Sequence, residues 1–313
     1  MKKLLLAAIF AALVSPASAQ NFLSIATSPT VGVYYQVGSA MAAVLNKALP
    51  DTETTAEVTN GSVDNVKLVA GDPTYVGFAS ADVVADAING KGAFDSKQPI
   101  QALAALYRNK VHVVARSEAG IARIADMKGK HVSTGVPGSG IEVIAFRLLE
   151  AAGVDKDTDI TREAIDPGNS VAALKDGKID AFFFVGGTPA ALVADVASTP
   201  GLSVNLVPVD DLLPALTAKY GDVYAADTIK GGTYEQMSGD VGIISFWNIL
   251  VANETMSLDQ AYSITKAIFE GKPDMVAATA VANGINIDNQ VAKNSPAPFH
   301  PGALKYTAEQ GVK

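Results

Sequence analysis

Short apolar segments alternate along the chain with turns of small or hydroxyl-bearing residues and with segments whose apolar residues recur at helical spacing. This alternation predicts strands over residues 22–26, 53–59, 75–79, 132–135 and 180–185. It also predicts a helix after each strand: four cover residues 34–48, 63–70, 81–87 and 141–152, and the fifth begins at Pro189, capped by Thr188. This order is typical of a doubly wound α/β protein, in which ligands bind beyond the carboxyl ends of the strands.

The turn at residues 137–140, with the sequence Pro-Gly-Ser-Gly, is a candidate binding turn. The first N–H groups of the helix that follows have no partner within the helix, and the helix dipole adds about half a positive charge there. Glycine lets a ligand approach the main chain closely, so the turn could bind an anion through its backbone. The alternative is an ordinary strand-to-helix connection in which Ser139 is the helix N-cap.

Residues 111–116 and 241–252 are strand-like but are not followed by a turn of this kind. We predict that they are the two crossings between two lobes, because a chain of about 290 residues exceeds what one core usually serves. Lobe 1 is expected to comprise residues 20–110 and 248–313, and lobe 2 residues 111–247. An amphipathic helix is expected over residues 257–270, and residues 294–302, with three prolines, are expected to form an irregular surface segment.

Residues 1–19 have the pattern of a secretory signal peptide: two lysines, an apolar run of eleven residues, and the cleavage site Ala17-Ser18-Ala19. The apolar run is shorter than the roughly 20 residues that span a bilayer. The chain contains no cysteine, which excludes a lipoprotein anchor and disulfide bridges. We therefore expect an exported periplasmic protein that begins at Gln20.

Acidic residues outnumber basic ones, so the formal net charge is −8, and it becomes −10 when the two lysines of the signal peptide are removed. Such a charge argues against nucleic acid or an anionic membrane surface as a partner. The three histidines, His112, His131 and His300, are far apart and lack the spacing of a metal site. We expect them to be structural, and we expect no metal and no cofactor.

Seven segments spread over nearly the whole chain after residue 20 carry a recognisable combination of residues. They are residues 27–35 with Gly38, and residues 61–65, 102–116, 129–153, 174–187, 261–270 and 300–304. Together they resemble the solute receptors of TRAP transporters, specifically those of the TAXI type. The combination is far more specific than any one of the segments.

The resemblance implies a two-lobed clamshell with the type II periplasmic-binding-protein fold. Such a protein holds a small solute between its lobes, as a monomer without enzymatic activity, and delivers it to a sodium-coupled TRAP permease in the membrane. The implied ligand is a small carboxylate, such as glutamate, a dicarboxylate or an oxoacid. The implied ligand-binding residues are Thr27, Ser28, Tyr34, Tyr35, Ser62, Asn65, Ser80, Asp82, Pro137, Ser139, Gly140, Phe184 and Gly186.

Val33 and Ile141 depart from the family pattern, because each stands where a hydroxyl-bearing residue is common. The loss of two polar contacts favours a ligand that has fewer hydrogen-bonding groups at one end than glutamate has. None of the five turns contains an arginine. A carboxylate would therefore be held by backbone N–H groups and hydroxyls, unless Arg116 or Arg147 reaches it.

Several implied site residues also have a structural interpretation. Tyr34 and Tyr35 could be core aromatics, and only one is expected at the ligand, because neighbouring helical residues point about 100° apart. Asn65 is preferred to Asp64, because a carboxylate would repel an anion. Asp82 could stabilise the first turn of a helix, or it could receive a substrate ammonium group.

An enzyme or a ligand sensor on the same fold is the alternative function. Ser62 or Ser139 could then act as a nucleophile. However, the sequence contains no G-x-S-x-G, P-loop, G-x-G-x-x-G or H-E-x-x-H motif, and no histidine lies next to either serine. A binding protein is therefore the preferred interpretation.

Overall fold

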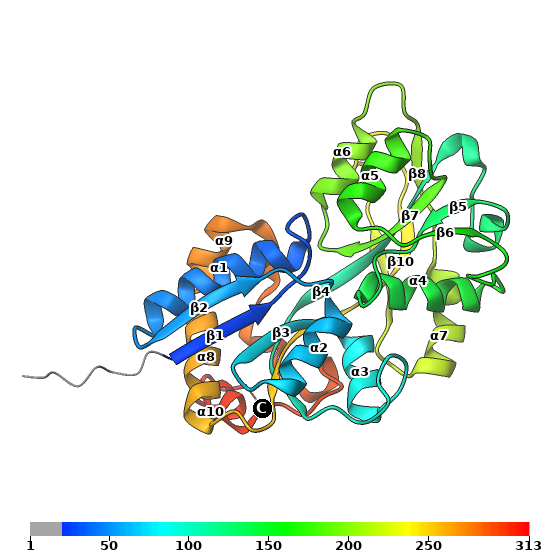
Figure 1. Ribbon diagram of the computed structural model, residues 1–313. Helices are drawn as coiled ribbons and strands as arrows, with labels where there is room; N and C mark the ends of the chain where they lie inside the picture. Colours follow the sequence, from blue (N-terminus) through cyan, green and yellow to red (C-terminus); the bar gives the residue numbers. More distant parts are fainter. Residues whose placement is uncertain (1–20, 313) are drawn as a thin grey trace, which may run out of the picture.

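The computed structural model describes residues 21–312 and shows an α/β protein whose two lobes are joined by two long strands (Figure 1). The expected signal peptide, residues 1–19, lies outside the described residues. Among residues 21–312, no helix is both long and apolar enough to cross a membrane.

One continuous sheet runs through both lobes in the order β2-β1-β3-β10-β4-β7-β5-β6, with β8 beside β4 and β9 beside β10. Its centre is the antiparallel pair of β4 (Ile100–Arg116) and β10 (Val241–Asn253). Most residues of both strands are buried, so neither shows the alternation of a strand with one solvent face. This pair carries the sheet from one lobe into the other (Figure 1).

In the first lobe, three parallel strands extend the sheet, and a helix follows each strand. The strands are β1 (Asn21–Ala26), β2 (Thr52–Glu57) and β3 (Tyr75–Ser80), and the helices are α1 (Val33–Ala48), α2 (Ser62–Gly71) and α3 (Ala81–Asn89). Alternate residues of β10 face opposite cores: Leu250 packs on the side of α1, and Ile249 packs on the side of α2 and α3. The sheet is therefore covered on both faces.

The second lobe is built around the other ends of β4 and β10. Its strands are β5 (His131–Ser133), β6 (Thr161–Glu163), β7 (Ala181–Gly186), β8 (Val204–Leu206) and β9 (Ala225–Ile229). Its helices are α4 (Gly140–Ala151), α5 (Pro167–Lys175), α6 (Ala191–Ala197) and α7 (Leu213–Tyr220). Phe182, Phe183 and Phe246 are fully buried in its core.

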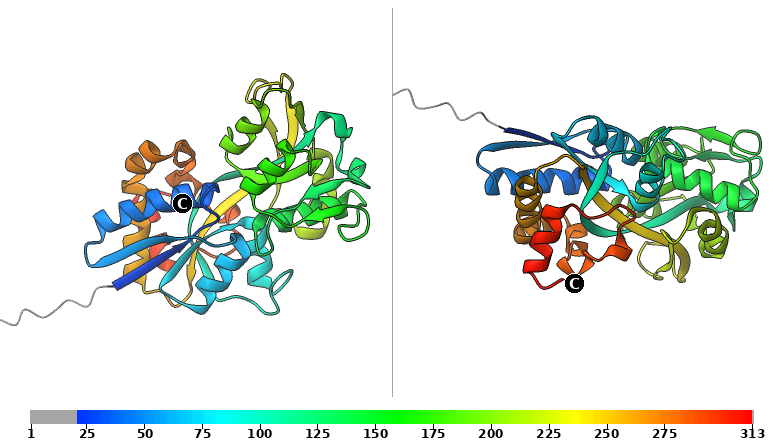
Figure 2. Two further views of the ribbon diagram at one scale, coloured as in Figure 1. Left: turned by 45° about the horizontal axis from the view of Figure 1, so that its top comes forward. Right: turned by 90° about the horizontal axis from the view of Figure 1, so that it is seen from below.

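After β10 the chain returns to the first lobe and ends there. The helices α8 (Leu258–Glu270), α9 (Lys272–Ala278) and α10 (Pro301–Glu309) lie against this lobe, and they are coloured orange to red in Figure 2. Phe299 forms a single bridge with Ala102 of β4, and Tyr306 of α10 packs against Tyr262 of α8. The first lobe is thus made of two separate parts of the sequence.

Three local predictions need correction. β4 begins at Ile100 rather than near residue 111, because its first half pairs with β10 inside the first lobe. The helix predicted from Pro189 begins at Ala191, and Thr188 is not its cap: the N–H of Ala190 instead donates to the Tyr234 hydroxyl. The irregular segment is followed by α10, whose N-cap His300 accepts a hydrogen bond from the N–H of Gly302. The residue at which one lobe ends and the other begins stays a prediction.

Candidate functional site

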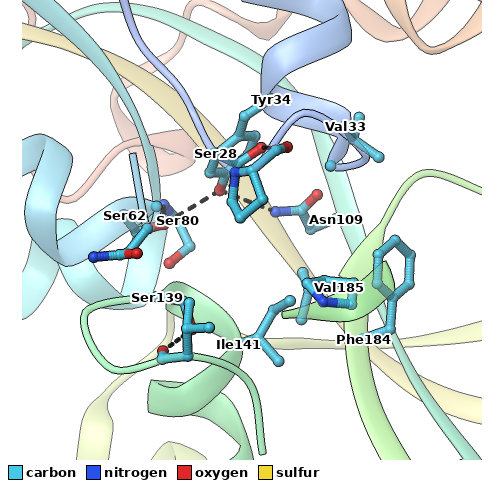
Figure 3. Close-up of a pocket in the computed structure, with 17 residues that line it drawn as sticks. Ser28, Val33, Tyr34, Ser62, Ser80, Asn109, Ser139, Ile141, Phe184 and Val185 are labelled. Carbon is cyan, nitrogen blue, oxygen red and sulfur yellow. Dashed lines mark hydrogen bonds between the residues drawn. The ribbon is translucent and has the colours of Figure 1, made fainter. Parts of the chain in front are cut away.

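A cavity of about 50 Å³ lies between the two lobes, where β1, β3 and β7 end and α1, α2 and α4 begin (Figure 3). The first lobe contributes Ser28, Pro29, Gly32, Val33, Tyr34, Asn60, Gly61, Ser62, Ser80 and Asn109 to its wall. The second lobe contributes Val136, Ser139, Gly140, Ile141, Pro167, Phe184 and Val185. A ligand in this cavity would therefore touch both lobes.

The first turns of α1 and α4 offer backbone donors at the cavity wall. The N–H groups of Val33 and Tyr34, at the start of α1, have no acceptor among residues 21–312. The same holds within this range for the N–H groups of Gly140 and Ile141, at the start of α4. Because each helix N-terminus also carries about half a positive charge, these turns favour an anion.

A connected group of polar side chains lines one end of the cavity. The Tyr34 hydroxyl donates to Asn248 Oδ1 at 2.5 Å and lies 3.3 Å from Ser62 Oγ, which also accepts from the Ser80 N–H. Asn109 Nδ2 donates to the same Asn248 Oδ1 at 2.6 Å. Burial raises the pKa of the Tyr34 hydroxyl well above its usual value, so Tyr34 is a neutral donor at any physiological pH.

Three polar atoms in this group lack a partner within residues 21–312. One is Asn248 Nδ2, and the other two are Ser80 Oγ and Asn109 Oδ1, on side chains that are each only about 1% exposed. A buried polar atom without a hydrogen bond costs about 1–3 kcal/mol, so such atoms are rare without a functional reason. Ser80 and Asn109 line the cavity, where a bound solute could satisfy them.

Apolar side chains line the other end of the cavity, namely those of Val33, Ile141, Phe184 and Val185 (Figure 3). Phe184 is backed by His112, whose ring centre lies 5.7 Å away. His112 Nε2 contacts the Tyr234 hydroxyl at 2.8 Å, and its Nδ1 contacts the Lys110 carbonyl at 3.0 Å. Since a carbonyl only accepts, Nδ1 carries the proton and Nε2 accepts from Tyr234. Burial lowers the pKa of His112 from 6.5 to about 4, which keeps the ring neutral.

None of the residues that line the cavity carries an ionisable carboxylate, ammonium, guanidinium or imidazole group. The two arginines that could have reached a ligand are committed elsewhere. Arg116 pairs with Glu118 and donates to the Leu174 carbonyl. Arg147 pairs with Asp86 and donates to the Tyr224 hydroxyl at 2.8 Å. An anion in the cavity would therefore be held by neutral donors alone.

The lobes touch directly at the rim of the cavity. The Gly138 carbonyl accepts hydrogen bonds from the N–H groups of Val63 and Asp64, which belong to the first turn of α2 in the other lobe. A Cβ on Gly140 would lie 2.7 Å from Ser62 Oγ and 3.0 Å from Ser80 Oγ. The absence of a side chain at Gly140 thus allows the lobes to approach this closely.

A buried ionic cluster joins α3 of the first lobe to the second lobe, and we call it the Arg147 cluster. Arg147 of α4 pairs with Asp86 and lies 3.8 Å from Asp82, and the Tyr224 hydroxyl donates to Asp82 at 2.8 Å. Burial alone would lower the pKa of Arg147, but Asp82, Tyr224 and Asp86 outweigh it and raise that pKa. Burial raises the pKa of Asp86, with Arg147 opposing the shift. The cluster therefore holds charges in place across the cleft.

The structure brings seven of the thirteen expected ligand-binding residues together in the cavity wall. They are Ser28, Tyr34, Ser62, Ser80, Ser139, Gly140 and Phe184. Two of the hydroxyls already have structural partners. Ser28 Oγ donates to the Pro29 carbonyl and accepts from the Tyr35 N–H. Ser139 Oγ donates to the Val136 carbonyl and accepts from the Glu142 N–H as the N-cap of α4.

The other six expected residues lie outside the wall. Thr27 and Asn65 are buried under it: the Thr27 hydroxyl donates to the Glu57 carbonyl, and Asn65 Nδ2 donates to the carbonyls of Thr27 and Phe78. Asp82 belongs to the Arg147 cluster. Tyr35 is not part of the wall although Tyr34 is, as expected for neighbouring residues of a helix. Pro137 and Gly186 are not part of the wall either, and their neighbours Val136 and Val185 line the cavity instead.

Sequence reasoning missed Asn109, Val136, Pro167 and Val185 as wall residues. Asn109 is the most important of them because its Oδ1 has no partner within residues 21–312. It lies in the middle of β4, whose first half the sequence analysis did not assign to a strand. Because it stands between Arg108 and Lys110, no local signal in the sequence distinguished it.

Comparisons with known proteins agree with this architecture. Residues 25–311 match the model of the NMT1-like family. Among solved structures, MatC from Rhodopseudomonas palustris with bound malate has a TM-score of 0.58 at 14% identity, covering 93% of this chain and 96% of that one. The periplasmic binding protein BugD has a TM-score of 0.55 at 14% identity, covering 94% of each chain. These structures show that the fold is that of a type II periplasmic binding protein.

The cap geometry of Ser139 leads to a prediction about Ser139→Ala. The free energy of unfolding should fall by about 1 kcal/mol, because the substitution removes a helix N-cap. The affinity for a carboxylate should change little, because the hydroxyl already has a donor and an acceptor in the protein. Urea unfolding without ligand and titration calorimetry measure the two quantities. Unchanged stability with a tenfold loss of affinity would instead make Ser139 a ligand contact.

The burial of His112 predicts how stability depends on pH. Between pH 6.5 and about 4 the unfolded state binds a proton that the folded state does not, so stability is lost as the pH falls through this range. The loss should reach about 3 kcal/mol at pH 4. Urea unfolding at pH 7 and at pH 4.5 should show it in the wild type, and His112→Gln should reduce it. His131→Gln, at an exposed histidine, should retain it; equal pH dependence in wild type and His112→Gln would contradict the assignment.

Proposed function

The chain belongs to the NMT1-like family, which corresponds to TAXI-type periplasmic binding proteins of TRAP transporters, and on this premise we propose that its solute is a small carboxylate. The family is one of solute-binding proteins of transport systems. We propose further that the protein works in the periplasm as a monomer. It would hand the solute to a sodium-coupled membrane permease.

The observation that carries the proposal is the cavity between the lobes, which has backbone donors but no ionised side chain. The N–H groups at the starts of α1 and α4 suit an anion, and Ser80 Oγ adds a neutral donor without a partner among the described residues. A carboxylate has the charge and the acceptor oxygens to satisfy these groups. MatC, a distant relative with the same fold, has malate bound in its structure, which supports a carboxylate as the class of ligand.

Binding is favoured over catalysis by the partners of the serine hydroxyls. Activation of a serine nucleophile requires a general base within hydrogen-bond reach. Ser62 Oγ contacts the Tyr34 hydroxyl and the Ser80 N–H, and Ser139 Oγ is a helix cap. Neither serine contacts a histidine or a carboxylate within residues 21–312.

The first test is a thermal-shift screen of the purified protein with glutamate, 2-oxoglutarate, succinate, malate and short monocarboxylates. A carboxylate at about 100 times its dissociation constant should add about 2.7 kcal/mol to the free energy of unfolding. That is a rise of several degrees in melting temperature for a chain of this size. Sodium chloride at equal ionic strength is the control. No shift with any carboxylate would overturn the proposal.

The second test concerns closure of the lobes, for which Gly140→Ala is the informative variant. A Cβ at this position would press on Ser62 and Ser80 across the cleft, and Gly140 has no positive φ that would strain the variant itself. Gly140→Ala should therefore fold normally but bind a carboxylate at least about tenfold more weakly, a cost of about 1.4 kcal/mol.

Small-angle scattering should show that the ligand reduces the radius of gyration of the wild type more than that of Gly140→Ala, since closure brings the lobes together. Gly71→Ala is the matched control, because a Cβ at Gly71 meets nothing within 4 Å. Wild-type affinity in Gly140→Ala would mean that close approach of the lobes at this point is not needed for binding.

A further inference from the structure

The cavity has a polar end and an apolar end, and this division limits which carboxylates it can hold. Ser62 and Ser80 lie at one end, Phe184 and Val185 lie at the other, and Asn109 lies between Val33 and Val185 (Figure 3). A ligand with polar groups at both ends would bury one of them against aliphatic and aromatic carbon. A ligand with one polar end and one apolar end matches both.

The start of α4 and Ser80 together suit a single carboxylate. Gly140, the first residue of α4, lies next to Ser80: a Cβ on it would be 3.0 Å from Ser80 Oγ, so a carboxylate at the start of α4 is also near this hydroxyl. Ser80 Oγ has no partner within residues 21–312, although its side chain is only about 1% exposed. These neutral donors and the partial charge of the helix are enough for one anionic group.

Asn109 Oδ1 calls for a hydrogen-bond donor on the ligand. The amide is oriented by its Nδ2, which donates to Asn248 Oδ1, an atom that also accepts from the Tyr34 hydroxyl. The oxygen of Asn109 is therefore the atom left without a partner among the described residues. It cannot form a hydrogen bond with a carboxylate or a keto oxygen, because both atoms would be acceptors and neither carries a hydrogen. A hydroxyl fits better than an ammonium group, because no ionised acid lines the cavity.

The apolar end disfavours a second carboxylate. Against the side chains of Ile141, Phe184 and Val185 that group would lose its hydration without gaining a cation or a donor side chain, so only the N–H groups at the start of α1 would remain to bind it.

We infer that the ligand is a short 2-hydroxy monocarboxylate with an aliphatic tail, and this inference rests on the proposed binding of carboxylates. The carboxylate binds at the start of α4 and at Ser80. The 2-hydroxyl donates to Asn109 Oδ1. The tail packs on Val33, Ile141 and Phe184. Asn109 selects the hydroxyl, and the apolar end rejects dicarboxylates.

A matched four-carbon series tests the inference by titration calorimetry on the wild-type protein: 2-hydroxybutyrate, butyrate, 2-oxobutyrate, 2-aminobutyrate and malate. 2-Hydroxybutyrate should bind about tenfold more tightly than butyrate or 2-oxobutyrate. Neither of these two has a hydroxyl, so each would leave Asn109 Oδ1 buried without a hydrogen bond, and a loss of this size is expected. It should bind at least about 100-fold more tightly than malate, in which a second carboxylate replaces the terminal methyl group.

The outcomes of this series separate the inference from the proposed function. If malate, butyrate or 2-oxobutyrate binds as tightly as 2-hydroxybutyrate, the inference is wrong and the proposed function stands. If 2-aminobutyrate binds more tightly, the group on Asn109 is an ammonium, and the inference is again wrong. If no carboxylate binds, the proposed function itself fails.

Asn109→Ala tests the role of the Asn109 amide. The quantity measured is a ratio of two dissociation constants, which would not change if the amide had only a structural role. The ratio of the dissociation constants of butyrate and 2-hydroxybutyrate should fall from about ten to near one, since the acceptor for the hydroxyl is gone. Asn169→Ala, on the exposed face of α5, should leave the ratio unchanged. An unchanged ratio in folded Asn109→Ala would overturn the assignment.

Ile141→Arg tests the apolar end independently and serves even if Asn109→Ala does not fold. A guanidinium at this position would offer a second carboxylate the bidentate partner that the wild type lacks. The preference should shift toward malate by at least about tenfold relative to 2-hydroxybutyrate. An unchanged preference would mean that this end of the cavity does not face the second carboxylate position.

Discussion

The structure depends on one constraint: two long antiparallel strands, β4 and β10, lie in the single sheet that runs through both lobes. Any relative movement of the lobes must therefore bend these two strands. Asn109 of β4 and Asn248 of β10 hydrogen-bond to each other where the register of the pair shifts, between Trp247 and Ile249. Such irregularities in a sheet redirect side chains and locally increase bending. The place where the strands can bend is thus also the place where polar side chains face the cavity.

The architecture of the site would let a protein of net negative charge hold the proposed anion without an arginine in the cavity wall. Backbone N–H groups at helix starts carry partial charges that are fixed in position and need no counterion. Their number and direction follow from the fold, whereas the side chains around them decide which solute fits. The hydroxyls of Ser28 and Ser139 stabilise the turns that present these donors.

The sequence was informative where structure follows from local pattern. The strand–turn–helix units were predicted because apolar spacing and turn residues are local properties, and the start of α4 lies within one residue of its prediction. It was least informative where partners come from distant segments. Asp82 looked like a site residue because it follows a strand end, but its partners Arg147 and Tyr224 come from the other lobe. Asn109 was missed because nothing near it in the sequence marks its pairing with Asn248.

The Arg147 cluster also bears on how strongly the lobes attract each other. Opening the cleft would separate Arg147 from Asp86 and expose both to water, and the hydration regained would offset most of the attraction lost, as is usual for buried ion pairs. The cluster therefore contributes little to the free energy that favours the closed arrangement of the lobes over an open one. It does disfavour any closed arrangement in which Arg147 and the aspartates do not meet, so it fixes the relative position of the two lobes. On this reasoning the solute itself would have to supply most of the free energy that keeps the two lobes closed.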